Sequence, residues 1–264
     1  GTQIGYQALM LVPSAPTPIV LSAATEVVVG GTSINGPSFH PRMPSGATNL
    51  NLGDDDYGPI DFATAGFSGF SYYGTGYTQC FVGSNGYVTF VSGNSSLIES
   101  GSAMLSTQPR ISPLWDDLNP STTSPSGNGS VNYSASSQAL TISWNAVGEF
   151  GFVGARNNFA VQLYDNDSFT LYYGSTSPDD GLVGISPGGL PVPLNTEHSN
   201  VDWSTNFYYG GSRGTVNPGA ARFERFAYAD LAGLLRDKLD IATVRRIHFA
   251  PDGLGGYTFF TGLR

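Results

Sequence analysis

Between positions 67 and 90, aromatic and β-branched residues alternate with small polar ones, and turn-forming residues interrupt the pattern twice. A period of two residues is typical of β-strands with one buried face. The interruptions are Gly74-Thr75-Gly76 and Asn85-Gly86, and the second dipeptide favours a type I′ hairpin turn. We therefore predict a strand, a turn, a strand, a tight hairpin and the start of another strand. We give Asn85-Gly86 no role beyond the turn.

Short apolar runs of the same kind recur at regular intervals through the rest of the chain. Further strands are predicted at residues 111–114, 129–133, 139–147, 158–164, 168–173 and 182–185, and as a terminal hairpin at 243–250 and 256–261. Short strands at this spacing indicate a sandwich or a barrel, and not alternating strands and helices. Within residues 223–239, apolar residues recur near a helical period, which predicts one helix. The expected fold is all-β, an antiparallel jelly-roll-like β-sandwich with one short C-terminal helix.

Composition fits that fold and excludes two kinds of partner. The chain has 264 residues with 35 glycines and 17 prolines, which suits many turns. Its net charge of −9 argues against binding nucleic acid or an anionic membrane surface. No apolar run is long enough for membrane insertion. Cys80 is the single cysteine, so it forms no disulfide within the chain, and we expect it to be buried.

Four segments, taken in order, resemble a known family. They are the run from Phe67 to Phe90 and residues 109–118 (PRISPLWDDL), 158–164 (NFAVQLY) and 179–186 (DDGLVGIS). Together they resemble the nidogen-like (NIDO) extracellular domain and its bacterial relatives over roughly residues 60–190. The resemblance implies a secreted or cell-surface protein of adhesion or matrix assembly, without catalytic machinery. We expect three regions: N-terminal strands and a loop (1–55), packed on the core or on a neighbouring subunit; the nidogen-like sandwich (56–204); and a C-terminal segment with a helix and a hairpin (205–264).

Clustered carboxylates are candidate calcium ligands. Asp54, Asp55 and Asp56 are consecutive, and calcium is bound by six to eight oxygen atoms, which aspartates and backbone carbonyls supply. The alternative is turn chemistry, because aspartate accepts hydrogen bonds from nearby backbone groups. Asp116 and Asp117 follow a predicted strand, where we expect them to accept hydrogen bonds from buried backbone donors at a corner.

An enzymatic role has little support in the sequence. A glycosidase needs two carboxyl groups held across a cleft, and Glu99 or Glu149 could pair with Asp116, but nothing in the sequence selects such a pair. The three histidines lack the spacing of metal ligands. We therefore expect no enzyme.

Tyrosine pairs offer a possible sugar-binding surface. Tyr72, Tyr172 and Tyr208 each belong to a run of adjacent aromatic residues, and aromatic faces can stack on sugar rings. The alternative is ordinary packing in the sandwich, because neighbouring residues of a strand face opposite sides.

Charge is unevenly distributed, which suggests assembly. Up to residue 210 there are three basic and fifteen acidic residues, and from residue 211 there are eight basic and five acidic. Attraction between the two regions of neighbouring subunits would build head-to-tail arrays, and we assign Arg222, Arg225, Arg245 and Arg246 to that contact. The alternative is that the basic segment packs on its own domain.

These observations predict a non-enzymatic extracellular structural or adhesive protein that assembles into a surface array or filament. Its expected partners are copies of itself, other surface proteins or glycans. The second hypothesis is a secreted carbohydrate-binding module that uses surface aromatics, with calcium as its cofactor.

Overall fold

The computed structural model describes residues 46–121, 127–176, 178, 180–192, 201, 203, 213–226 and 246–262. The chain divides into two units, residues 1–36 and 37–264, and everything described belongs to the second. Most of the predicted N-terminal region and residues 227–239 of the predicted helix lie outside these ranges. The proposed division into three regions stays a prediction.

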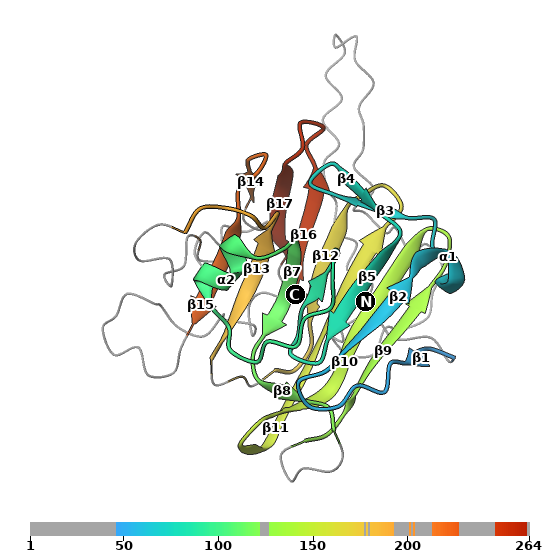
Figure 1. Ribbon diagram of the computed structural model, residues 1–264, viewed down its shortest axis with the longest axis vertical. Helices are drawn as coiled ribbons and strands as arrows, with labels where there is room; N and C mark the ends of the chain where they lie inside the picture. Colours follow the sequence, from blue (N-terminus) through green and yellow to red (C-terminus); the bar gives the residue numbers. More distant parts are fainter. Residues whose placement is uncertain are drawn as a thin grey trace, which may run out of the picture. The chain divides into compact units, whose positions relative to one another are not determined.

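The described chain is mostly β-strand, in two large sheets that face each other (Figure 1), and every strand pair that it contains is antiparallel. The larger sheet has the order β1-β9-β10-β11-β12-β16-β17-β14, with β8 also paired to β10. Its strands are β1 (Thr48–Asn49), β8 (Leu118–Asn119), β9 (Ser130–Ala135), β10 (Ala139–Glu149), β11 (Phe152–Tyr164), β12 (Phe169–Tyr173), β14 (Arg213–Val216), β16 (Arg246–Pro251) and β17 (Tyr257–Gly262).

The smaller sheet has the order β15-β13-β7-β6-β5-β2. Its strands are β2 (Tyr57–Asp61), β5 (Gln79–Gly83), β6 (Val88–Thr89), β7 (Arg110–Trp115), β13 (Gly181–Ser186) and β15 (Arg222–Phe226). A separate hairpin and two short helices complete the described elements: β3 (Phe70–Tyr72), β4 (Thr75–Tyr77), α1 (Phe62–Ala65) and α2 (Gly101–Ser106). The all-β prediction is confirmed.

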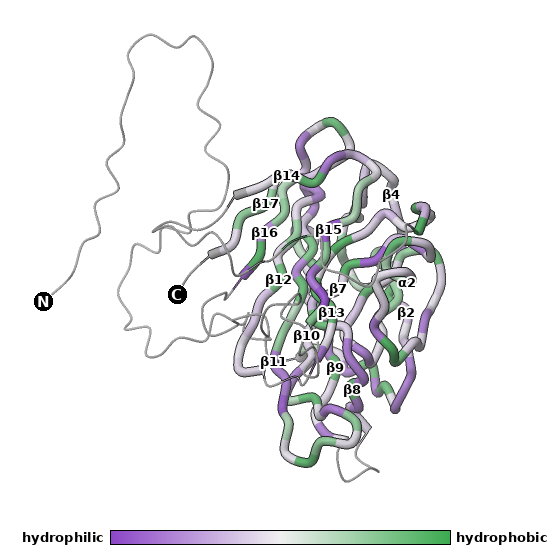
Figure 2. Tube along the Cα trace, turned by 90° about the vertical axis from the view of Figure 1, so that its left-hand side faces the viewer, coloured by the Kyte–Doolittle hydropathy of each residue, from purple (hydrophilic) through white to green (hydrophobic). Residues whose placement is uncertain are grey.

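The main core fills the space between the two sheets, and buried rings link them by hydrogen bonds. Trp144 of the larger sheet donates from Nε1 to the Gly83 carbonyl of the smaller sheet at 3.1 Å. The Tyr173 hydroxyl likewise donates to the Pro113 carbonyl at 2.8 Å. Each ring therefore fills the apolar interior and satisfies a carbonyl of the opposite sheet. In strands such as β2 and β16, exposed or half-buried residues alternate with buried ones, and Figure 2 shows hydrophilic and hydrophobic positions mixed through the sandwich.

The smaller sheet is covered on its outer face as well. A second apolar cluster there contains Tyr87, Trp115, Leu182 and Phe223, and Met104 of α2 packs into it. This cover explains why every residue of β7 and β13 is buried. Sequence analysis missed α2, whose N-terminus is capped by a short serine side chain.

The Asn85-Gly86 hairpin lies where predicted, between β5 and β6, but the turn type was wrong. A type I′ turn needs positive φ at both central residues, and here φ is positive at Gly86 (79°) but not at Asn85. A type I turn followed by a left-handed glycine fits this backbone. Tyr73 and Gly74 instead have the two consecutive positive φ angles, 49° and 77°, in the β3–β4 turn.

The C-terminal region gives one confirmation and one correction. The terminal hairpin is present as β16 and β17, which pair with each other. The predicted helix is wrong at its start, because Phe223 and Phe226 lie in strand β15, paired with β13. Their spacing of three residues places them on opposite faces of the strand, and each face packs against a different apolar cluster.

Two smaller expectations concern Cys80 and the membrane. Cys80 is fully buried, as expected, and this burial raises the pKa of its thiol. Within the described ranges, the helices are all too short or too polar to cross a bilayer.

His248 of β16 gives the fold a pH dependence whose sign can be worked out. Burial, followed by the nearby charge of Arg246, lowers the pKa of His248 from 6.5 to about 4. Its ring also contacts Phe260 and Tyr164, and its Nδ1 lies 2.8 Å from the Thr170 hydroxyl. The unfolded chain therefore binds a proton that the folded chain does not, as the pH falls from 6.5 toward 4.

We expect the free energy of unfolding to fall over that interval because of this residue. The loss should be about 1–2 kcal/mol between pH 7 and pH 4.5, below the full linkage value because the ring is partly exposed. Urea unfolding of the wild type and of His248→Gln at both pH values isolates the effect, since all carboxylates are common to both proteins. Equal pH dependence in the two proteins would contradict the assignment.

Candidate functional site

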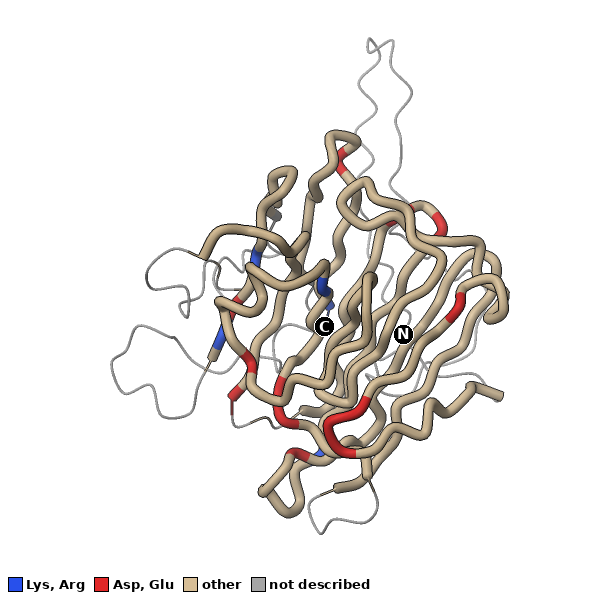
Figure 3. Tube along the Cα trace, in the orientation of Figure 1, with Lys and Arg blue, Asp and Glu red and all other residues tan. Residues whose placement is uncertain are grey.

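Acidic residues gather at one end of the sandwich, where the loop before β2, the β5–β6 turn and the β7–β8 link meet (Figure 3). The loop and the link are far apart in sequence, and a buried amide joins them. Asn85 accepts a hydrogen bond from the Leu118 backbone at 2.9 Å and donates one to the Asp55 carboxylate at 2.8 Å. The backbone carbonyl of Asn85 also accepts a hydrogen bond from the Asp116 backbone N–H at 3.3 Å. Asn85 is thus a structural link that the sequence analysis missed.

Of the three consecutive aspartates, Asp56 has a structural role. Its two carboxylate oxygens accept hydrogen bonds from the backbone of Gly53 at 3.1 Å and of Tyr57 at 2.8 Å. This is the turn chemistry that was the alternative to calcium binding. Asp54 and Asp55 are exposed.

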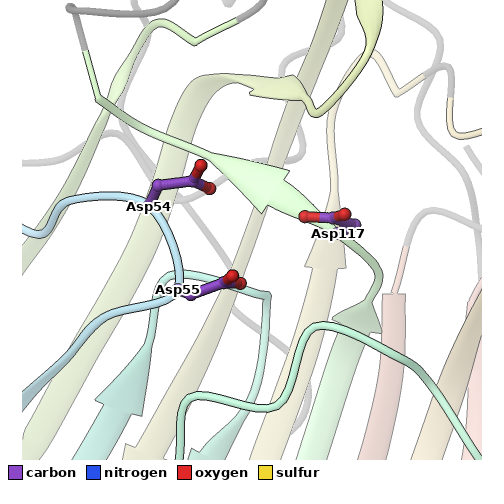
Figure 4. A group of neighbouring side chains, drawn as sticks. All are labelled: Asp54, Asp55 and Asp117. Atoms are coloured by element: carbon purple, nitrogen blue, oxygen red, sulfur yellow. The ribbon is translucent and has the colours of Figure 1, made fainter.

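Asp54 and Asp55 instead form a group with Asp117, which the sequence does not place beside them (Figure 4). One oxygen from each of the three carboxylates lies within 4.8 Å of the others. Figure 4 shows Asp54 and Asp117 pointing toward each other, Asp54 from the loop before β2 and Asp117 from the link just before β8. Three oxygen donors at this separation suit a hard cation such as calcium.

The electrostatics of this group also favour a cation. Partial burial, and then the charges of Asp55 and Asp54, raise the pKa of Asp117 to about 6. Partial burial and the charge of Asp55 raise the pKa of Asp54 as well. The second part of each shift comes from repulsion between the ionised carboxylates, which a bound cation would remove.

A second carboxylate group lies behind the first. Glu99 and Asp116, one of the pairs that a glycosidase would need, come together with Asp180. Asp116 is 2% exposed and Glu99 is 7% exposed, so a sugar cannot reach between them in this structure. Asp116 also accepts a hydrogen bond from the backbone of Asp117 at 2.7 Å, consistent with its predicted role at a corner.

The predicted sugar-binding tyrosines do not form a surface together. Tyr72 is 1% exposed, packs against Phe90 and donates to the Arg110 carbonyl at 2.8 Å, so its assignment to ligand binding is corrected. Tyr172 is half-buried and its hydroxyl lies 3.2 Å from that of Tyr164. Tyr208 lies outside the described residues.

The basic residues assigned to assembly are partly used within the fold. Arg225 forms a salt bridge with Glu99, with Nη2 3.2 Å from Oε1. Arg222 and Arg246 are half-buried, and Arg245 lies outside the described ranges. Their contact with a neighbouring subunit stays a prediction.

An exposed apolar tip lies beside the acidic end, and the sequence analysis did not identify it. Phe150, Phe152 and Val153, at the β10–β11 turn, are 50%, 49% and 80% exposed. The Phe150 backbone donates to the Asp117 carbonyl at 2.8 Å, which holds the tip against the first carboxylate group. The available signal was an apolar run that continues across a glycine turn, where polar residues are usual.

These features define an antiparallel β-sandwich protein with carboxylates and exposed apolar side chains at one end. A family model described as NIDO related matches residues 32–216, which is more than half of the chain. The chain therefore belongs to this nidogen-related family, and the resemblance seen in the sequence is confirmed. No curated protein and no solved structure matches it.

Proposed function

We propose that this protein is a non-enzymatic extracellular structural or adhesive protein that assembles with copies of itself into a surface array or filament. The exposed tip at Phe150, Phe152 and Val153 is the observation that supports this proposal. Contiguous exposed apolar side chains are typical of surfaces that bind other proteins, because the interface removes these side chains from water. Family membership supports an extracellular location. We also propose that the strands of the sandwich are connected as in a jelly roll.

Charge provides the second element of the proposed assembly. The acidic end carries Asp54, Asp55 and Asp117, and the basic residues lie mostly after position 210. A head-to-tail contact between these regions would repeat along a filament, and salt would weaken it.

The test compares assembly of the wild type with that of a Phe150→Ser, Phe152→Ser and Val153→Ser triple variant. We expect the wild type to form ordered polymers by electron microscopy and to scatter more light at low salt than at high salt. The triple variant should lose most of this assembly while keeping its thermal stability, because exposed side chains contribute little to folding.

Leu254→Ser is the matched control, because Leu254 is 80% exposed in the β16–β17 turn, away from the acidic end. It should assemble as the wild type does. A wild type that is monomeric at every salt concentration would contradict the proposal, and so would a triple variant that assembles normally.

A secreted carbohydrate-binding module is the second candidate. The carboxylate group in Figure 4 supports its calcium dependence, because calcium could be shared between the protein and sugar hydroxyls. Binding to a glycan array that a chelator abolishes, by a protein that does not polymerise, would favour this candidate over the first.

A further inference from the structure

The second carboxylate group joins three elements that are distant in sequence. Glu99 lies just before α2, Asp116 follows β7, and Asp180 precedes β13. Strands β7 and β13 are neighbours, with Trp115 paired to Leu182, so the two aspartates flank the same end of that pair. One oxygen from each of the three carboxylates lies within 4.8 Å of the others.

Glu99 and Asp116 are buried and Asp180 is half-buried, whereas the first group is more exposed, and one Asp116 oxygen has no partner among the described residues. Asp116 is 2% exposed, and its Oδ1 accepts the hydrogen bond from Asp117. Its Oδ2 is buried and has no hydrogen-bond partner among the residues that the structure describes. Buried carboxylate oxygens are nearly always bonded, so an orphan atom of this kind is a natural position for an ion or an ordered water.

Among the described residues, the charges close to Asp116 are mostly negative. Arg225 pairs with Glu99 at 3.2 Å and brings one positive charge. Against it stand the carboxylates of Glu99, Asp116 and Asp180. Burial, followed by the charges of Glu149 and Asp180, raises the pKa of Asp116 to about 9. Each negative charge close to Asp116 would be stabilised by a bound cation.

The donor set selects the kind of cation. The three donors are carboxylate oxygens, which hard cations prefer. Two oxygens on opposite sides of a calcium ion would be about 4.6–5.2 Å apart, so the observed separations fit one ion. Magnesium requires a stricter octahedral arrangement and retains more of its water, which suits a buried site less well.

We propose that Glu99, Asp116 and Asp180 form a buried calcium site, distinct from the Asp54 group, that ties α2, β7 and β13 together. This site does not depend on the proposed assembly function. Calcium would give Asp116 Oδ2 its missing partner and offset the charge of the cluster. The bound ion would then stabilise the folded chain, because the unfolded chain cannot bring the three residues together.

The experiment uses the full chain after removal of bound metal by a chelator. Calcium chloride is titrated by calorimetry, and thermal unfolding is followed with and without calcium. Terbium provides a second probe, because Trp115 lies next to Asp116 and can sensitise its luminescence. We expect calcium to raise the melting temperature of the wild type, and Asp116→Asn to bind calcium at least about tenfold more weakly.

Two further variants separate this site from others. Asp165→Asn alters an exposed turn aspartate outside both groups, and should keep the calcium-induced shift. Asp54→Asn removes a ligand of the outer group, and should keep it too. Loss of the shift in Asp54→Asn but not in Asp116→Asn would place calcium at the outer group and overturn the proposal.

The stability of Asp116→Asn without calcium tests whether Asp116 has a purely structural role, since such a role predicts a loss of stability even in the absence of the ion. Without calcium, Asp116→Asn should be about as stable as the wild type, because the asparagine Oδ1 can still accept the hydrogen bond from the Asp117 backbone. A wild type that calcium does not stabilise would overturn the proposal and would mean that protons neutralise the cluster. If Asp116→Asn does not fold, Asp180→Asn replaces it in the experiment, because Asp180 is only half-buried. We expect the same loss of calcium binding in that variant.

Discussion

Gly86→Ala is expected to prevent stable folding. An alanine Cβ at this position would lie 1.7 Å from the Leu114 carbonyl oxygen and 2.7 Å from its carbon. Both atoms belong to the backbone of β7, a strand buried throughout, so they cannot move aside. Gly86 also has a φ of +79°, which costs a residue with a Cβ about 1–2 kcal/mol.

The two effects together should remove more than about 4 kcal/mol, a large part of the stability of an ordinary domain. In a chain of this size that corresponds to a melting temperature at least about 10 °C lower, or to insoluble protein. Circular dichroism on heating measures the change. A loss of this size would show that the β5–β6 turn must touch β7 closely, and that the acidic end depends on that contact.

Gly74→Ala is the matched control. Gly74 has nearly the same φ, +77°, but a Cβ there would have nothing within 4 Å. It should therefore show the backbone strain alone, about 1–2 kcal/mol. If the two variants lost equal stability, the contact with Leu114 would not be the cause.

The same turn shows how far local sequence carries a prediction. Alternation located the strands around it because each strand has one face in the main core. The turn type could not be predicted, since Asn85 is held by Leu118 and by Asp55, which lie 33 and 30 residues away in the sequence. A hairpin preference derived from isolated dipeptides does not include such contacts.

The misassigned helix has a similar cause. The three-residue spacing of Phe223 and Phe226 fits the apolar face of a helix, and it fits equally well a strand that is buried on both faces. The structure selects the strand because β13 pairs with it and because α2 covers the outer face of the sheet. Sequence analysis had not predicted α2, so a buried outer face was not considered.

The candidate site was only partly predictable. Consecutive aspartates at 54–56 marked an acidic loop, but which of them turn inward depends on the backbone, and Asp56 proved to cap its own turn. Asp117 joins the group through the fold alone. The assignment of Tyr72 failed because alternation fixes the period of a strand but not which face is buried.

Trp144→Ala is expected to produce the other large loss of stability, about 3–5 kcal/mol. The indole is fully buried and lies parallel to the Phe159 ring, with centroids 4.9 Å apart and an interplanar angle of 13°. Its removal leaves a cavity between the sheets and takes away one of the two hydrogen bonds that the Gly83 carbonyl accepts, the other coming from the Gly86 backbone. Urea unfolding measures the loss of free energy. We expect the slope of the free energy of unfolding against urea concentration to stay the same as in the wild type.

Trp144→Phe separates packing from the hydrogen bond. A phenyl ring keeps most of the contact with Phe159 but cannot donate to Gly83, so we expect a smaller loss of about 1–3 kcal/mol. Val153→Ala, at a side chain that is 80% exposed, should change stability by less than about 0.5 kcal/mol. If Trp144→Ala were as mild as Val153→Ala, the two sheets would not be joined at this ring. A loss in the expected range would instead show that the sandwich, and with it the position of the β5–β6 turn at the acidic end, depends on contacts across the interior.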